Sequence, residues 1–221
     1  MLRHQAYFVT GTDTEVGKTF ATCALLHAAR QKGLQAIGMK PIAAGVDADG
    51  RNDDVEQLIA ASSLAAPREL VNPYCFDAPV APHIAAAVEG QIIAAGRIAA
   101  AARDLASDVD LLLVEGVGGF RVPLGDDFDS ADLADRLDLP IILVVGLRLG
   151  CLNHALLTAE AIQTRGLLLA GWIANCVDPD MPWPEENVTA LKERLPAPLL
   201  GVLPWFDNPD PAEAAQRLSL P

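Results

Sequence analysis

One stretch near the start of the chain constrains the fold more than any other. Gly11, Gly17, Lys18 and Thr19 approximate the spacing G-x-x-x-x-G-K-[ST], with five residues instead of four between the two glycines, and they stand between an apolar run at residues 7–9 and a helical pattern at residues 20–30. Glycines at these positions let backbone N–H groups turn inward around phosphate oxygens, and the start of the next helix adds its positive end. The lysine and the hydroxyl that follow serve the terminal phosphates and a Mg²⁺ ion. The stretch therefore predicts a nucleotide-binding site.

Composition limits the other possibilities. The chain has 221 residues, of which 51% are apolar and 5% aromatic, so we expect one domain, residues 1–221, with a mainly aliphatic core. The net charge of −13 disfavours nucleic acid and anionic membrane surfaces as partners. No apolar run reaches membrane-spanning length, and none follows residues 1–5 as in a signal peptide. Four scattered cysteines without a C-x-x-C pair suit reduced thiols in the cytoplasm.

Apolar runs alternate with helical patterns along the rest of the chain. Strands are predicted at residues 34–39, 109–114, 141–145, 168–174 and 199–203. Helices are predicted at residues 52–61, 92–105, 131–136, 150–165, 186–195 and 212–218, whereas residues 43–51 and the proline-rich residues 67–82 are expected to be irregular. Unbroken apolar strands between helices indicate a mostly parallel sheet covered by helices on both faces. We therefore predict an α/β fold of the P-loop NTPase type.

Polar residues follow several of these strands, at the edge where open parallel sheets bind ligands. The phosphate loop, Lys40, Glu115, Arg148 and Asn175 all have this position. Glu115 resembles the second acid of nucleotide sites, which holds Mg²⁺ directly or through water. Lys18 already serves the phosphates, so Lys40 suggests extra negative charge, as on a phosphoryl group in transfer. The alternative for Lys40 is a surface lysine at a strand end.

Two further features each have two readings. Asp54 could complete the metal site, or it could be an ordinary first-turn acid of a helix capped by Asp53. The run from Gly150 to Asn153 could bind a carboxylate with its free N–H groups, or it could be an ordinary helix start capped by Asn153.

Three other residues give no catalytic signal. His83 and His154 stand at helix starts without a paired metal ligand, so we read them as caps or packing residues. Cys151 has no base beside it in the sequence, which argues against a nucleophile.

Taken together, the motifs resemble those of the dethiobiotin synthetase family. The resemblance extends from residue 7 to about residue 208 and is carried by FVTGTDTEVGKT at 8–19, KP at 40–41, VNPY at 71–74, PH at 82–83, VEGVGG at 114–119, GCLNHA at 150–155 and GWIAN at 171–175. It implies a homodimeric cytoplasmic enzyme that closes the ureido ring of dethiobiotin from 7,8-diaminononanoate, CO₂ and Mg·ATP. One amine would capture CO₂ as a carbamate, the carbamate would take the γ-phosphoryl group, and the second amine would expel phosphate.

The resemblance also implies a role for each matching residue. Lys40 and Lys18 would be catalytic, and Mg²⁺ would be held by Thr19, Asp54 and Glu115. The nucleotide would be bound by Glu15, Val16, Gly17, Lys18, Thr19, Phe20, Asp54, Glu115, Gly116, Val117, Gly118, Asn175, Cys176, Pro204, Trp205, Phe206 and Asp210. The second substrate would be bound by Thr14, Lys40 and Ala44, and its carboxylate, across the dimer interface, by Gly150, Cys151, Leu152 and Asn153.

Ala44 departs from the family pattern, which commonly has a serine that offers its hydroxyl to the substrate. One such hydrogen bond contributes about 1 kcal/mol net, so we expect weaker substrate binding and retained activity. Residues 45–51 form a short loop whose contribution the sequence leaves open.

Two other functions compete with this one. A regulatory switch ATPase of the partitioning or division-site type shares the predicted fold, but such proteins commonly carry a further lysine where this chain has Thr12, and they bind DNA or membranes. The acidic balance and the tail at residues 212–218, which lacks a basic face, argue against it. An amidotransferase-linked synthetase acting on a cobalamin precursor would need a glutaminase domain, for which 221 residues leave no room.

Overall fold

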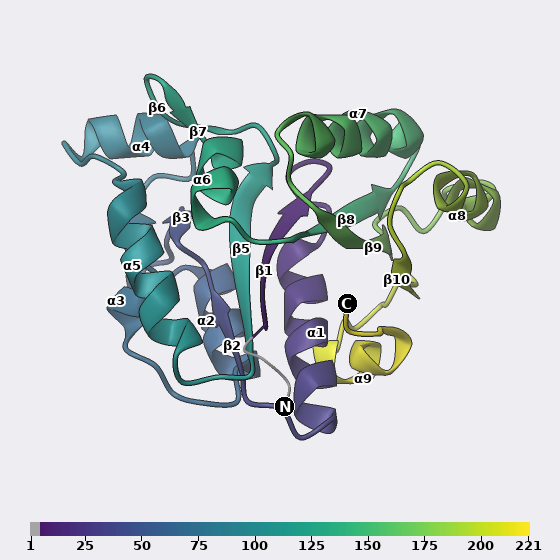
Figure 1. The fold of residues 1–221 in the computed structure, drawn as a ribbon, viewed down its shortest axis with the longest axis horizontal. Coiled ribbons are helices and arrows are strands. Elements are labelled where there is room, and N and C mark those ends of the chain that lie inside the picture. Colours follow the sequence, from purple (N-terminus) through teal and green to yellow (C-terminus); the bar gives the residue numbers. More distant parts are fainter. Residues whose placement is uncertain (1–4) are drawn as a thin grey trace.

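The protein is built on a six-stranded parallel sheet with helices on both faces (Figure 1). The structure, a computed structural model, describes residues 5–221. The strands of the sheet are, in spatial order, β10 (Leu199–Leu203), β9 (Leu169–Cys176), β8 (Ile141–Leu147), β1 (Gln5–Gly11), β5 (Leu111–Gly119) and β2 (Ala36–Met39). The predicted α/β fold of the P-loop NTPase type is confirmed.

Helices and two small sheets complete the described part of the chain. The helices are α1 (Lys18–Gln31), α2 (Asp53–Ala61), α3 (Arg68–Val71), α4 (Pro82–Val88), α5 (Ala95–Ala106), α6 (Ser130–Leu137), α7 (Cys151–Thr164), α8 (Pro184–Lys192) and α9 (Pro211–Ala214), with a 3₁₀ turn η1 (Ala215–Arg217). The small sheets pair β3 (Ile42–Ala44) with β4 (Tyr74–Phe76) and β6 (Pro123–Gly125) with β7 (Phe128–Asp129). Across residues 5–221, no helix combines the length and the apolarity that crossing a bilayer requires.

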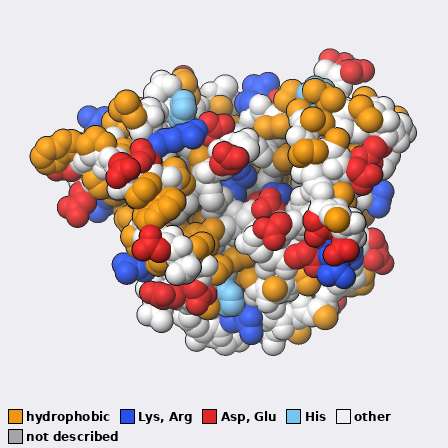
Figure 2. Space-filling model, turned by 180° about the vertical axis from the view of Figure 1, so that it is seen from behind, with side chains coloured by type: hydrophobic (Ala, Val, Ile, Leu, Met, Phe, Trp, Pro, Cys, Tyr) orange, Lys and Arg blue, Asp and Glu red, His pale blue; other side chains and the backbone are white. Residues whose placement is uncertain are grey.

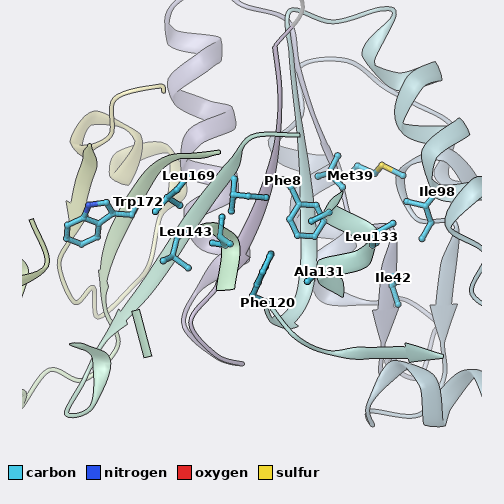
Figure 3. Packing of buried hydrophobic residues seen from close by; sticks show 14 of the residues in the cluster. Phe8, Met39, Ile42, Ile98, Phe120, Ala131, Leu133, Leu143, Leu169 and Trp172 are labelled. Atoms are coloured by element: carbon cyan, nitrogen blue, oxygen red, sulfur yellow. The ribbon is translucent and has the colours of Figure 1, made fainter. Parts of the chain in front are cut away.

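The apolar strands bury both of their faces. Along β1, Phe8 joins the cluster that includes residues of α4 to α8, whereas Tyr7 and Val9 join the cluster that includes residues of α1, α2 and α9. Figure 3 shows Phe8 near Leu133 of α6 in the larger cluster. Successive strand residues point to opposite faces, so a strand covered on both sides must be apolar throughout. The unbroken apolar runs of the sequence follow from this arrangement.

Capping groups fix where the helices begin and end. The carboxylate of Asp129 accepts from the Asp132 N–H at the start of α6, and the Asp132 carboxylate accepts from the Asp129 N–H, which forms a capping box. At the end of α1, Gly33 takes a φ of 77°. The Leu34 and Gly33 N–H groups donate to the carbonyls of Ala29 and Arg30, which is a Schellman motif. Gly33 therefore ends α1.

Two segments predicted to be irregular contain regular structure. Residues 67–82 contain α3 and β4. The segment 43–51 contains the end of β3, and β3 pairs with β4. The Asn72 side chain joins them, because its Nδ2 donates to the carbonyls of Lys40 (2.6 Å) and Tyr74 (3.0 Å). These strands are three residues long and form through pairing between distant segments, which local periodicity does not reveal.

Other boundaries also differ from the prediction. β5 continues past residue 114 to Gly119 after a shift in its register against β1, and the β6–β7 pair was not predicted. Asn52 caps α2 by accepting from the Val55 N–H, so Asp53 is not the cap. Gly150, with a φ of 96°, is the N-cap of α7, so the reading of Asn153 as its cap is wrong.

Candidate functional site

The phosphate loop joins β1 to α1 at the carboxyl edge of the sheet. Glu15 and Gly17 both have left-handed backbone conformations, with φ of 58° and 77°, and Gly17 is the N-cap of α1. A Cβ on Gly17 would lie 2.1 Å from Asn175 Nδ2. That amide donates to the Val16 carbonyl at 2.9 Å, so the side chain of Asn175, at the end of β9, holds the phosphate loop in place. Only glycine fits at position 17.

Lys18 is the first residue of α1 and lies almost entirely inside the protein, with 7% of its surface exposed. Its ammonium donates to the Asp13 carbonyl at 3.1 Å. Burial, followed by the nearby positive charge of Lys40, lowers the pKa of Lys18 to about 8. A triphosphate at this loop would supply the negative charge that favours the protonated lysine.

Lys40 lies between the two predicted metal-binding carboxylates. Its ammonium is 2.6 Å from Glu115 Oε1 and 2.9 Å from Asp54 Oδ2, and it donates to the Gly116 carbonyl at 3.4 Å. The Thr19 hydroxyl donates to the same Glu115 oxygen at 2.8 Å. Lys40 is 3% exposed and Glu115 is fully buried. The reading of Lys40 as a surface lysine is therefore wrong.

The ion pairs decide the charge state of this cluster. Burial is the largest influence on Lys40 and lowers its pKa, but the Glu115 and Asp54 carboxylates outweigh it, so the pKa of Lys40 is raised. Burial likewise raises the pKa of Asp54, and the Lys40 ammonium outweighs it, so the pKa of Asp54 is lowered. Asp54 stands in the first turn of α2, after the Asn52 cap. Its negative charge is therefore favourable at the start of the helix as well as beside Lys40.

The donor set at this point fits a magnesium ion. Glu115 Oε2 is buried and has no hydrogen-bond partner among residues 5–221, and a buried carboxylate oxygen without a partner is costly. Mg²⁺ takes hard oxygen ligands and usually binds through one or two carboxylates together with phosphate oxygens, which Thr19, Asp54 and Glu115 could supply with ATP. Within residues 5–221, no three His, Cys, Asp or Glu side chains gather as a metal site by themselves.

Aromatic residues from the end of the chain lie beside the start of α1. The rings of Phe20 and Phe206 pack edge to face with centroids 5.6 Å apart, and Trp205 is 49% exposed. Asp210 caps α9 by accepting from the Ala212 N–H. Cys176 follows Asn175, and its thiol lies 3.4 Å from the Asp178 carbonyl. Phe206, one of the residues predicted to bind the nucleotide, therefore lies next to the phosphate loop.

The start of α7 is less open than the sequence suggested. The Cys151 N–H already donates to the Arg148 carbonyl at 3.0 Å, and the Cys151 thiol is buried. The N–H groups of Leu152 and Asn153, in the first turn, have no acceptor within the helix. They are the groups that remain for a carboxylate.

Two residues near the site stand in the motifs quoted above, but the sequence assigned no role to either side chain. Asn72 fixes the backbone on both sides of the β3–β4 connection through its bonds to Lys40 and Tyr74. Asp13, inside the phosphate loop, forms an ion pair with Arg148 at 2.5 Å. Both depend on contacts between segments far apart in the chain.

Residues 45–47 and 51 line a cavity together with Asp54. Its volume is about 400 Å³, and Asp47, Arg51, Asp53 and Pro79 are among its lining residues. A larger cavity of about 760 Å³ lies between α4 and the β6–β7 pair. None of the phosphate-loop residues lines that cavity, so we place the candidate site at the carboxyl edge of the sheet.

Comparison with known proteins identifies the family. Residues 5–213 match the family model described as an AAA domain. The chain is 58% identical over its full length, and over the full length of the relative, to the ATP-dependent dethiobiotin synthetase BioD of Aromatoleum aromaticum. Solved structures of the MinD cell division protein of Aquifex aeolicus (TM-score 0.56, 14% identity, 96% of this chain and 85% of that one) and of a ParA family ATPase of Chlorobium tepidum (TM-score 0.55, 13% identity, 96% and 88%) share the fold alone. The chain belongs to the dethiobiotin synthetase family.

Proposed function

We propose that this protein is an ATP-dependent dethiobiotin synthetase, a ligase of biotin biosynthesis that forms C–N bonds. Full-length identity of 58% to a curated enzyme of that name supports the assignment. The observation that carries it in the site is the meeting of two buried lysines with two carboxylates and a hydroxyl at one point of the sheet edge. A phosphoryl group in transfer between two anions carries negative charge that a second buried lysine can stabilise, and in this chain the second lysine comes from the end of β2 and not from position 12 of the phosphate loop.

The phosphate loop and Lys18 would bind the triphosphate of ATP. Backbone N–H groups of Glu15 to Thr19 surround the phosphates in this proposal, and Lys18 neutralises the charge of the terminal ones. Thr19, Asp54 and Glu115 would hold Mg²⁺, which supplies further neutralisation of the phosphates. Asn175 and Cys176 would contact the adenine, and residues 204–206 with Asp210 would form the wall beside it. Gly116, Val117 and Gly118, at the end of β5, would line the phosphate side.

Lys40 would act on the reacting atoms of the second substrate. One amine of 7,8-diaminononanoate adds to CO₂ and loses a proton, which gives a carbamate. A carbamate oxygen then forms a bond to the γ-phosphorus as the bond to ADP breaks. The second amine attacks the carbonyl carbon of the mixed anhydride, loses its proton, and expels phosphate as the ring closes. The ammonium of Lys40 would stabilise the negative charge on the carbamate and on the phosphoryl group in transfer.

The chain of the second substrate would extend past Thr14 and Ala44 toward a partner subunit. We infer a homodimer in which the Leu152 and Asn153 N–H groups of one subunit bind the substrate carboxylate in the other. Exposed apolar side chains around α7 support this arrangement, because Leu149 is 93% and Leu157 is 56% exposed, and such residues mark interaction surfaces when they gather. The cavity beside residues 45–51 borders Asp54 and would receive part of this substrate.

The wider assignment follows from the same family. We infer a cytoplasmic enzyme and a single domain over residues 1–221, in which both core clusters share one sheet. Acidic side chains are spread over the face drawn in Figure 2, in line with the net charge of −13. This charge opposes binding to nucleic acid and to anionic membranes.

The decisive experiment measures ATP turnover with 7,8-diaminononanoate and bicarbonate and detects dethiobiotin by mass spectrometry. The wild-type protein should form ADP only when both other substrates are present. Lys40→Ala should lose product almost completely, whereas the control Lys32→Ala, at an exposed lysine, should keep it. ATP hydrolysis at an equal rate without the diamine, or ATP-dependent binding to DNA or liposomes, would favour the switch-ATPase reading.

A further inference from the structure

The end of β8 is tied to the phosphate loop by two hydrogen bonds. The Thr12 N–H donates to the Val144 carbonyl at 3.0 Å, and the Gly146 N–H donates to the Thr12 hydroxyl at 3.4 Å. These bonds bring the segment that follows β8 alongside the loop. Arg148 lies in that segment, and its guanidinium reaches Asp13 Oδ2 at 2.5 Å.

Asp13 makes three contacts that together define one side of the phosphate loop. One carboxylate oxygen accepts from the Thr14 N–H at 2.8 Å, and the other accepts from Arg148. Its backbone carbonyl accepts from the Lys18 ammonium. A change in the position of Asp13 would therefore also move the group that contacts Lys18.

The Asp13 carboxylate also poses an electrostatic problem. It lies in a loop that must accept the negative charges of a triphosphate, and like charges at short range repel each other. Arg148 is the partner that neutralises it, and neither side chain is deeply buried, with 39% of Arg148 and 47% of Asp13 exposed. The pair is therefore available to a ligand that arrives at the loop.

We propose that Arg148 is a positioning residue for ATP, which orients Asp13 and cancels its charge so that the phosphate loop can accept a triphosphate. The inference depends only on the ATP-binding part of the proposed function. It concerns a residue that contacts the loop and need not contact ATP. The guanidinium would act through Asp13, so its importance should disappear once the Asp13 charge is removed.

The test measures ADP and ATP binding by isothermal titration calorimetry for the wild type, Arg148→Ala, Arg148→Lys, Asp13→Asn and the double variant. Arg148→Ala should weaken nucleotide binding by about fivefold, the upper range for a partly exposed ion pair. Arg148→Lys should stay near the wild type because it retains the charge. In the Asp13→Asn background, removal of Arg148 should change the affinity by less than about twofold, because the carboxylate no longer needs a counter-charge.

Steady-state kinetics separates this role from a structural or a direct one. In the ligase assay, Arg148→Ala should raise KM for ATP and leave kcat and the melting temperature close to the wild type. An equal loss of affinity in the Asp13→Asn background would overturn the proposal, since Arg148 would then contact the nucleotide itself. A rise in KM for the diamine alone would overturn it too. Calorimetry does not depend on product formation, so the proposal can stand even if dethiobiotin is not the product.

Discussion

Replacing Lys40 by methionine should destabilise the metal-free protein strongly. The change keeps the length of the side chain but removes the ammonium from between Glu115 and Asp54, which lie 2.6 and 2.9 Å away. Removing one partner of a buried ion pair costs about 3–5 kcal/mol, because it leaves a buried charge without compensation. Glu115 is fully buried and bears this cost, whereas the Asp54 side chain is 42% exposed and water screens it. We therefore expect the lower end, about 3 kcal/mol.

This loss corresponds to a clear shift in melting temperature. A chain of this size loses about 2–4 °C per kcal/mol, so Lys40→Met should melt about 6–12 °C below the wild type in a chelator. The measurement is differential scanning calorimetry at neutral pH, with Lys32→Met as the control at an exposed lysine. If Thr19, Asp54 and Glu115 hold Mg²⁺, added magnesium should raise the melting temperature of Lys40→Met more than that of the wild type.

A double variant identifies the charge as the cause. Lys40→Met combined with Glu115→Gln removes the uncompensated carboxylate and should recover part of the lost stability while abolishing the response to magnesium. The reasoning is refuted if Lys40→Met melts within about 2 °C of the wild type, or if Glu115→Gln lowers its stability further.

Three further predictions concern other parts of the molecule. Gly17→Ala should weaken ADP binding at least tenfold in calorimetry, because its Cβ would lie 2.1 Å from Asn175 Nδ2 at a φ of 77°. Unchanged affinity would contradict the conclusion that only glycine fits at position 17. Arg165→Ala should lower the free energy of unfolding by up to about 1 kcal/mol at pH 7. The hydrogen bond from Arg165 lowers the pKa of Asp132, so this stability is present above the unfolded pKa of about 3.9 and is lost as the pH falls below it. Urea unfolding should show that Arg165→Ala lowers the free energy of unfolding more at pH 7 than at pH 3. An equal loss at the two pH values would contradict a stabilising ion pair between Arg165 and Asp132. Leu149→Glu, at a 93% exposed leucine, should shift the proposed dimer toward monomer in light scattering, and an unchanged mass would exclude Leu149 from the interface.

The sequence predicted the sheet and the phosphate loop because both are local signals. A strand covered on both faces must be apolar throughout, and the phosphate loop needs glycine at position 17 for a backbone reason visible in the motif. The β3–β4 pair escaped prediction because each strand is three residues long and is held by Asn72 across segments distant in sequence. The sequence did not predict Gly150 as the cap of α7 because asparagine is a more common N-cap residue than glycine. In the structure the left-handed backbone conformation of Gly150 makes it the N-cap.

The motifs indicated several residues that the structure brings together at the sheet edge, but not how they are arranged. Lys40, Asp54 and Glu115 were each expected near the phosphates, yet no spacing in the chain could show that Lys40 bridges both carboxylates. The ion pair between Asp13 and Arg148 likewise joins residues 135 positions apart. Such contacts depend on how the strands are ordered in space, which the motifs do not encode.

The central position of β1 has a consequence for synthesis on the ribosome. Gln5 pairs with Leu111 and Phe8 with Ile141, so the first strand to emerge has no neighbour in the sheet until about half of the chain has been made. At about 5–20 residues per second, the wait is on the order of ten seconds, during which an apolar strand is open to chaperones. The phosphate loop is held by a hydrogen bond from the Asn175 side chain, at the end of β9, to the Val16 carbonyl. A nascent chain that stops before β9 therefore lacks a complete nucleotide site, and ATP can stabilise the protein only near the end of translation.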